Sequence, residues 1–286
     1  MNELDDRIER ITGARPVRYE PRGGGYSTAD RFTVPLADGE RVFVKSSDAE
    51  NLAGWIRREH EVYAALQGHA FMPALVGWDD DGVRPVLVTE DLSDAEWTPR
   101  WDDARVQAVL DATGELARAA APPNTRDVRE THAGLWGRWE TVQQDPAPFL
   151  SLGLRDDAWL VHALPEILAA VERAPVTGSD VCHLDLRSDN MCFRGDRLVL
   201  VDWNWTSLAN TEADVAAWLP SLRVEGGPAP WEVLPGVAEI GAWIAGIWAA
   251  VAGTPPPPTA PNVRALQKAQ LAVALDWLDR ELLRPN

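Results

Sequence analysis

The chain has 286 residues, of which 45% are hydrophobic and 25% charged, and its formal net charge is −17. Such a chain can form one large or two smaller globular units, and its acidity argues against nucleic acid or an anionic membrane as the main partner. It has no apolar run of about 18–20 residues, no basic and apolar leader and only two cysteines. We therefore expect a cytoplasmic protein, a monomer or a homodimer, with no membrane or nucleic-acid partner.

The first third of the chain predicts a small antiparallel sheet with two helices. Apolar residues at helical spacing predict helices over 3–12 and 49–68. Segments rich in Val, Phe and Thr alternate in polarity, as half-buried strands do, and the sequence ADG at 37–39 is typical of a hairpin turn. The predicted strands are 28–36, 41–46, 74–78 and 84–90.

The rest of the chain predicts mainly helices. Two short strands, 191–194 and 197–201, interrupt the helical pattern, with RGDR at 194–197 as the turn between them. We place a lobe boundary near residue 91, which gives a nucleotide-binding lobe at 1–91 and a catalytic and acceptor-binding lobe at 92–286. The predicted helices are 102–120, 130–144, 157–173, 211–222, 235–252 and 262–283.

The stretch HLDLRSDN at 183–190, followed by an apolar run that ends at Asp202, has a composition suited to phosphoryl transfer. That reaction needs phosphates held, a divalent cation placed and a hydroxyl oriented beside a carboxylate. Asp185, Asn190 and Asp202 offer two carboxylates and one amide oxygen, which are ligands that Mg²⁺ prefers. No His and Cys residues occur at a recognised zinc spacing.

The spacing H-x-D-x-x-x-x-N, with VDW at 201–203, resembles the aminoglycoside phosphotransferase family of small-molecule kinases. The resemblance spans roughly residues 20–220 and implies an α+β, bilobal, protein-kinase-like fold, with a small β-rich N-terminal lobe and a larger helical C-terminal lobe. It also implies transfer from ATP or GTP, with Mg²⁺, to an alcohol group of a small molecule. We expect Asp185 as catalytic base, and Asn190 and Asp202 as metal ligands.

The same resemblance assigns the upstream nucleotide-binding residues. The loop GGGYS, with Gly24, Gly25 and Ser27, is expected over the phosphates, since glycine allows close approach of the backbone. Lys45 ends the strand VFVK and is expected to contact the α- and β-phosphates. It is one of only two lysines in a chain that otherwise uses arginine, the other being Lys268.

Glu59, on the following helix, is the expected partner of Lys45. Glu61 is the alternative partner. It lies two residues after Glu59 on the predicted helix, so its side chain faces a different side of that helix. The segment VLVTEDL at 86–92 resembles the interlobe hinge, where the Thr89 carbonyl and the Asp91 N–H would bind the nucleobase. Asp214 matches a residue that supports the catalytic loop.

Two positions depart from the family pattern. The glycine common after the histidine is Leu184 here, and Arg187 lies two residues after Asp185. Arg187 is expected to contact the γ-phosphate, and the alternative is a surface ion pair with Asp189. An arginine at the acceptor mouth would also repel a polycationic aminoglycoside.

Three hypotheses follow for the function. The first is a kinase that phosphorylates a small-molecule hydroxyl, with an antibiotic, sugar, nucleoside or amino alcohol as acceptor. The second is a catalytically silent nucleotide-binding protein with the same fold. The third is transfer of a nucleotide instead of a phosphate, which would use the same metal ligands. Resistance to an antibiotic, biosynthesis and salvage all remain open as the biological role.

Overall fold

The computed structural model describes residues 3–23, 28–97, 100–132, 134–258 and 260–283. The chain divides into two compact units. The lobe boundary near residue 91 remains a prediction. The first unit also contains two segments that lie far beyond residue 91 in the sequence. The first unit comprises Met1–Pro99, Ala120–Asn124 and Ser188–Thr206, and the second comprises Arg100–Ala119, Thr125–Arg187 and Ser207–Asn286.

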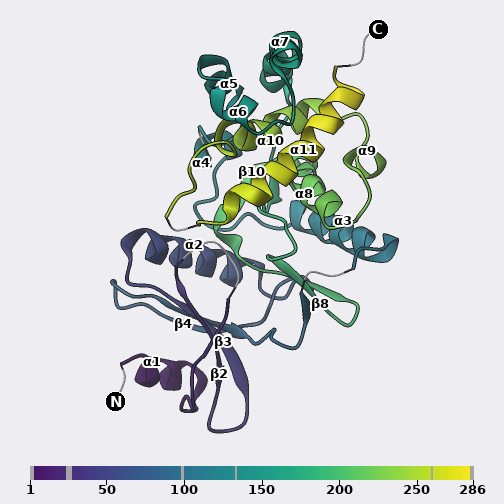
Figure 1. The fold of residues 1–286 in the computed structure, drawn as a ribbon. Helices are drawn as coiled ribbons and strands as arrows, with labels where there is room; N and C mark the ends of the chain where they lie inside the picture. The colour runs from purple at the N-terminus through teal and green to yellow at the C-terminus, as the bar shows by residue number, and fades with distance from the viewer. Residues whose placement is uncertain (1–2, 24–27, 98–99, 133, 259, 284–286) are drawn as a thin grey trace. The chain divides into compact units, whose positions relative to one another are not determined.

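The first unit contains a five-stranded antiparallel sheet with the order β1-β2-β3-β5-β4. Successive side chains of a strand face opposite sides, and alternate valines of β2, β3 and β5 form one apolar core with Leu4 and Ile8 of α1. Helix α2 covers the other face of the sheet (Figure 1). The elements are α1 (Glu3–Thr12), β1 (Glu20–Pro21), β2 (Asp30–Pro35), β3 (Arg41–Ser46), α2 (Glu50–Leu66), β4 (Leu75–Asp79) and β5 (Val86–Glu90).

A smaller sheet of the first unit carries the two predicted metal ligands. Its strands β6 (Glu96–Trp97), β8 (Met191–Arg194) and β9 (Arg197–Leu200) are antiparallel in the order β6-β8-β9, and the 3₁₀ helix η1 (Trp203–Trp205) follows. Asn190 directly precedes β8, and Asp202 follows β9 by two residues. The hairpin therefore brings its two ends together, and Val201 N–H donates to the Asn190 carbonyl at 2.9 Å.

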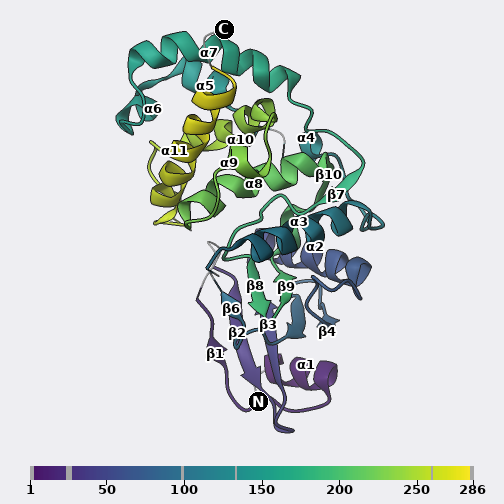
Figure 2. The same cartoon turned by 90° about the vertical axis from the view of Figure 1, so that its right-hand side faces the viewer.

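The second unit is helical and packs around α10 (Figure 2). The sequence of α10, AEIGAWIAGIWAAV, is apolar on all sides, as expected for a helix surrounded by other helices. Helices α5, α6, α7, α8 and α11 contact it, and strands β7 and β10 form a two-stranded ladder. The elements are α3 (Asp103–Ala117), α4 (Val128–Thr131), α5 (Trp139–Gln144), α6 (Ala147–Ser151), α7 (Asp157–Arg173), β7 (Asp180–Cys182), β10 (Ser207–Ala209), α8 (Thr211–Val224), α9 (Pro230–Val233), α10 (Ala238–Val251) and α11 (Val263–Glu281).

The single helix predicted over 130–144 is wrong. Two short helices, α4 and α5, occupy the region, and Gly134 and Gly137 lie between them with φ of 73° and 69°. Glycine adopts this left-handed conformation without steric cost, and a Cβ on Gly137 would lie 3.0 Å from both Trp243 and Val171. The short elements β1, β6, β7, β10, α6, α9 and η1 were not predicted, whereas the other predicted strands and helices are confirmed to within a few residues.

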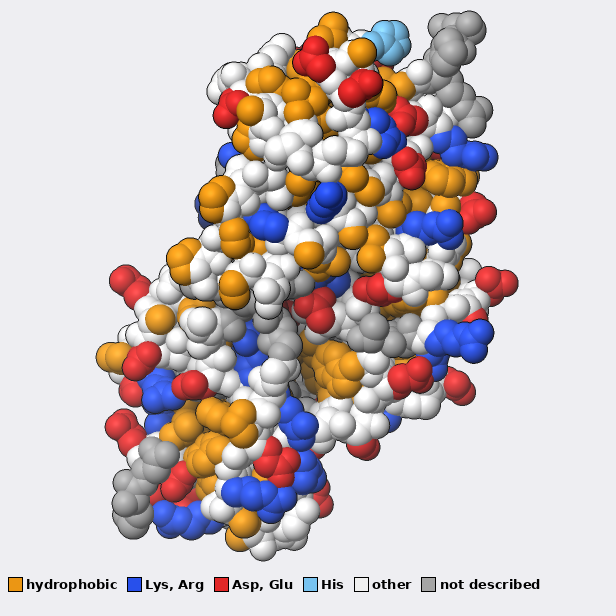
Figure 3. Space-filling view, viewed as in Figure 1, with side chains coloured by type: hydrophobic (Ala, Val, Ile, Leu, Met, Phe, Trp, Pro, Cys, Tyr) orange, Lys and Arg blue, Asp and Glu red, His pale blue; other side chains and the backbone are white. Residues whose placement is uncertain are grey.

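The sequence predicts two features of the surface and the helices: charges spread along the chain, and no apolar run long enough to span a bilayer. Acidic and basic side chains are interspersed over the face seen in Figure 3, with no large area of one sign. Among the described residues, no helix has the length and apolarity needed to cross a bilayer.

Candidate active site

A pocket of about 490 Å³ lies in the first unit, on the sheet face that α2 covers. Strands β2, β3 and β5 supply Arg31, Thr33, Phe43, Lys45 and Thr89 to its lining, and α2 supplies Glu59 and Tyr63. Because the valines between these strand residues face the opposite core, the period-2 alternation alone explains why polar side chains gather here. The rest of the pocket is formed by the hinge after β5 and by residues 188–190, 201 and 202.

Lys45 forms two ion pairs at the inner end of the pocket. Its Nζ donates to Glu59 Oε2 at 2.6 Å and to Asp202 Oδ1 at 3.0 Å. The Lys45 and Glu59 side chains are only 8% and 4% exposed, whereas that of Asp202 is 23% exposed. The expected pairing with Glu59 is present, and its rival Glu61 instead bonds Arg58 at 3.0 Å.

Burial and charge act in opposite directions on Lys45. Burial lowers the pKa of the ammonium, but the negative charges of Asp202 and Glu59 outweigh it, so the pKa is raised and the lysine stays charged. Burial raises the pKa of the Glu59 carboxyl, an effect that the charge of Lys45 opposes. The site therefore keeps a buried cation ready for an anionic ligand.

Asn190 and Asp202 line the pocket together and fit a Mg²⁺ ion by their chemistry. Mg²⁺ prefers hard oxygen donors and usually takes only one or two from protein, the rest coming from water and substrate phosphates. In the described part of the chain no three His, Cys, Asp or Glu side chains gather as a metal cluster. An amide oxygen and a carboxylate oxygen are thus the candidate ligand pair.

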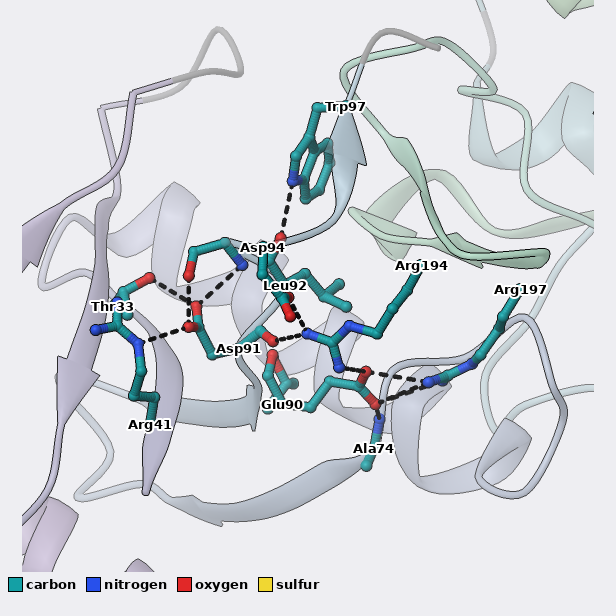
Figure 4. Close-up of polar contacts among 12 residues, drawn as sticks. Thr33, Arg41, Ala74, Glu90, Asp91, Leu92, Asp94, Trp97, Arg194 and Arg197 are labelled. Carbon is teal, nitrogen blue, oxygen red and sulfur yellow. Dashed lines mark hydrogen bonds and ion pairs between the residues drawn. The ribbon is translucent and has the colours of Figure 1, made fainter. Parts of the chain in front are cut away.

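The hinge after β5 is held by the carboxylate of Asp91 (Figure 4). Its Oδ1 accepts from Thr33 Oγ1 at 2.8 Å, and its Oδ2 accepts from Arg41 Nε at 3.0 Å and from Ser93 Oγ at 2.6 Å. Burial would raise the pKa of Asp91, but these hydrogen bonds lower it, so the group is an anion. The carboxylate is saturated by its own chain and acts on the hinge, not on a ligand.

The two residues predicted to contact the nucleobase differ in their backbone surroundings: Thr89 lies in the ladders of β5 with β3 and β4, whereas Asp91 follows the strand. Thr89 is 4% exposed, and both Thr89 and Asp91 line the pocket. Among the described residues the structure gives no acceptor to the Asp91 N–H. This donor is therefore available to a ligand in the pocket.

Sequence reasoning missed a second set of hinge contacts, drawn in Figure 4. Arg194 and Arg197, on the hairpin that begins after Asn190 and ends before Asp202, bond Glu90 Oε1 at 3.2 and 3.1 Å. Arg194 also donates to the Asp91 carbonyl. The sequence RGDR predicts a turn. The two arginines that flank its two-residue tip are the sequence feature that could have indicated these contacts.

The predicted catalytic loop is held in the second unit by Asp214, at the start of α8. Its carboxylate accepts from the N–H groups of His183 and Leu184 at 2.8 and 2.7 Å. Burial raises the pKa of Asp214 to about 6, although both hydrogen bonds lower it. The supporting role predicted for Asp214 agrees with these contacts.

Leu184 and the two predicted catalytic residues lie on this loop. Leu184 has φ of 61° and is 2% exposed, so the position where a glycine was expected does have a glycine-like backbone. Arg187 Nη1 lies 3.0 Å from Asp185 Oδ1, and both side chains are about one-fifth exposed, at 19% and 20%. Arg187 thus pairs with Asp185 itself.

The structure brings together one group of predicted residues within each unit. Lys45, Glu59, Thr89, Asp91, Asn190 and Asp202 line the pocket of the first unit, and Asp185 and Arg187 form an ion pair in the second. The predicted phosphate-loop residues Gly24, Gly25 and Ser27 lie outside the described residues.

Comparisons with known proteins identify the family of the chain. Residues 18–253 match the model of the phosphotransferase enzyme family, APH. No curated protein matches the chain in sequence.

The similar solved structures have low identity and cover nearly whole chains. A putative fructosamine-3-kinase from Thermobifida fusca is 19% identical over 96% of this chain and 99% of its own, with a TM-score of 0.56. A choline/ethanolamine kinase family protein from Mesorhizobium loti is 16% identical over 97% and 96%, with a TM-score of 0.60. A complex of APH(2″)-IIIa with GDP and kanamycin is 12% identical over 96% and 97%, with a TM-score of 0.59.

The chain belongs to the phosphotransferase enzyme family, whose model matches most of its length. The expected family and the α+β, protein-kinase-like fold class are confirmed. The protein is accordingly a phosphotransferase.

Proposed function

We propose that this protein transfers the γ-phosphate of ATP or GTP to a hydroxyl group of a small molecule. The observation that carries the proposal is the buried Lys45, paired with Glu59 and Asp202 in the same pocket as Asn190. A loose phosphoryl-transfer transition state needs positioning and charge stabilisation more than covalent chemistry. A buried cation beside two oxygen ligands meets that need.

In this mechanism Lys45 binds the phosphates, and Glu59 holds the lysine in place. Asn190 and Asp202 would hold Mg²⁺, which supplies neutralising charge to the phosphates when bound. The hinge backbone at Thr89 and Asp91 is proposed to bind the nucleobase, and Gly24, Gly25 and Ser27 are the proposed phosphate-loop residues.

Asp185 orients the acceptor hydroxyl and takes its proton as the phosphoryl group passes from the nucleoside diphosphate to the acceptor oxygen. Arg187 Nη1, 3.0 Å from Asp185 Oδ1, orients this carboxylate. A guanidinium has five N–H donors, so Arg187 can hold Asp185 with one and offer others to the transferred phosphoryl group. This refines the predicted role of Arg187 without excluding the γ-phosphate contact.

The acceptor is proposed only by class. Antibiotics, sugars, nucleosides and amino alcohols carry suitable hydroxyls, and a net charge of −17 favours neutral or singly cationic acceptors over anionic ones. We also propose that the protein works in the cytoplasm as a monomer or a homodimer.

A mass-spectrometric screen tests the proposal. The wild type and Asp185→Asn are incubated with Mg²⁺ and ATP or GTP against a panel of these acceptor classes. We expect a product heavier by one phosphate, formed by the wild type alone. A product heavier by a nucleotide would instead establish nucleotide transfer.

Binding measured in parallel separates the remaining alternative. If the wild type binds nucleotide tightly but modifies no acceptor and hydrolyses no ATP, the protein is a silent nucleotide-binding member of the family. If it binds neither ATP nor GTP, the assignment of the pocket is wrong.

A further inference from the structure

Arg31 is a pocket residue that neither the motif nor the family resemblance singled out. It lies on β2, where Phe32 and Val34 belong to the apolar core and the alternate residues Arg31 and Thr33 face the pocket. The β2–β3 register places Arg31 directly opposite Lys45, and Thr33 opposite Phe43. Arg31 and Lys45 are therefore nearest neighbours on one sheet face, with Cβ atoms about 5 Å apart.

Two cations in this arrangement repel each other. Like charges directly opposite across two strands are destabilising, and the charge of Arg31 lowers the pKa of Lys45. Glu59 and Asp202 both pair with Lys45, and the formal charges of these two carboxylates and the two cations sum to zero. Two cationic side chains side by side on the wall of one pocket suit an anionic ligand with more than one charge.

We propose that Arg31 binds the polyphosphate of the nucleotide together with Lys45, which rests on the nucleotide-dependent function proposed above. The two side chains have different geometries: Lys45 offers a point charge, whereas a guanidinium presents a planar set of N–H donors that matches two phosphate oxygens. Gly23, the first residue of the predicted phosphate loop GGGYS, lines the same pocket. Arg31 thus lies on the strand that this loop enters.

The binding of a series of nucleotides to Arg31→Gln tests this role. Calorimetric titration with adenosine, ADP and ATP, and with the guanosine series, is performed in the presence of Mg²⁺ on the wild type and the variant. We expect the variant to bind ADP and ATP at least about tenfold more weakly, the usual effect of losing a charge-assisted hydrogen bond, and to bind the nucleoside unchanged. Arg31→Lys keeps the charge without the planar donors and should lose less than Arg31→Gln.

Arg84→Gln is the matched control. Arg84 bonds Asp30 at 2.6 Å and Ser46 at 3.0 Å, at the ends of the same two strands, but does not line the pocket. The Arg84→Gln variant should bind adenosine, ADP, ATP and the guanosine series with the affinity of the wild type.

Equal affinity of the wild type and Arg31→Gln for ADP would overturn the role of Arg31 and leave the proposed function standing. An equal loss for nucleoside and ADP would also overturn it, because that result indicates a general effect on the sheet. Failure of the wild type to bind any nucleotide would overturn both proposals.

Discussion

The two units hold their functional groups by different physical means. In the first unit, Lys45 is fixed by opposite charges on Glu59 and Asp202, from a helix and from the end of a hairpin. In the second, Asp214 fixes the backbone of the catalytic loop through the N–H groups of His183 and Leu184. Changes in the first unit should therefore alter nucleotide binding and charge balance, whereas changes in the second should alter turnover and loop geometry.

The largest expected effect is on turnover and lies in the second unit. Asp185→Asn removes the proposed base and should lower kcat by about 10²- to 10⁴-fold, while nucleotide affinity stays within a few-fold of the wild type. Steady-state kinetics with the acceptor found in the screen, and calorimetry with ADP, measure the two quantities. A variant with near-normal kcat would remove Asp185 from the base role.

The next effect tests charge balance in the first unit. Lys45→Met leaves the Glu59 carboxylate buried without its cation, and breaking a buried pair in this way typically costs about 3–5 kcal/mol of folding free energy. Urea unfolding measures the loss, and calorimetry should show weaker ADP binding.

A double variant, Lys45→Met with Glu59→Gln, is the control for that prediction. It should regain part of the stability, because no unpaired buried carboxylate is left, but none of the ADP affinity. If stability is not regained, the loss comes from packing and not from an uncompensated charge.

A third effect is a pH dependence from Asp214. Its pKa is about 6 in the folded chain against an ordinary 3.8, so the folded state holds the proton over a range where the unfolded state has lost it. The contribution of Asp214 to the free energy of unfolding should therefore fall as pH rises from about 4 to 6, by about 3 kcal/mol. The difference in stability between the wild type and Asp214→Asn, measured by urea unfolding at several pH values, isolates this contribution. A pH-independent difference would contradict it.

The smallest effect concerns the left-handed backbone of Leu184. Both Leu184→Ala and Leu184→Gly lose the buried side chain, but only glycine adopts the φ of 61° without steric cost. We expect the glycine variant to be more stable than the alanine variant by about 1 kcal/mol, in urea unfolding. A more stable alanine variant would show that the loop does not hold this conformation in solution.

These predictions also show how far the sequence could be interpreted. Hydrophobic periodicity located most helices and strands, and the spacing of HLDLRSDN located the loop residues. Hydrophobic periodicity gave a wrong prediction between 130 and 144, where apolar residues have helical spacing but Gly134 and Gly137 adopt left-handed conformations. Local periodicity does not show which glycine a distant Trp243 will pack against.

The sequence by itself determined the family, the order of the elements and the chemical types available at the site. Tertiary structure decided which of those groups meet: Lys45 with Glu59 and Asp202, Arg31 opposite Lys45, and Glu90 with Arg194 and Arg197. The reason is physical. Local propensity depends on neighbours in the chain, whereas strand register and charge burial depend on segments that are far apart in sequence and become neighbours only when the chain folds.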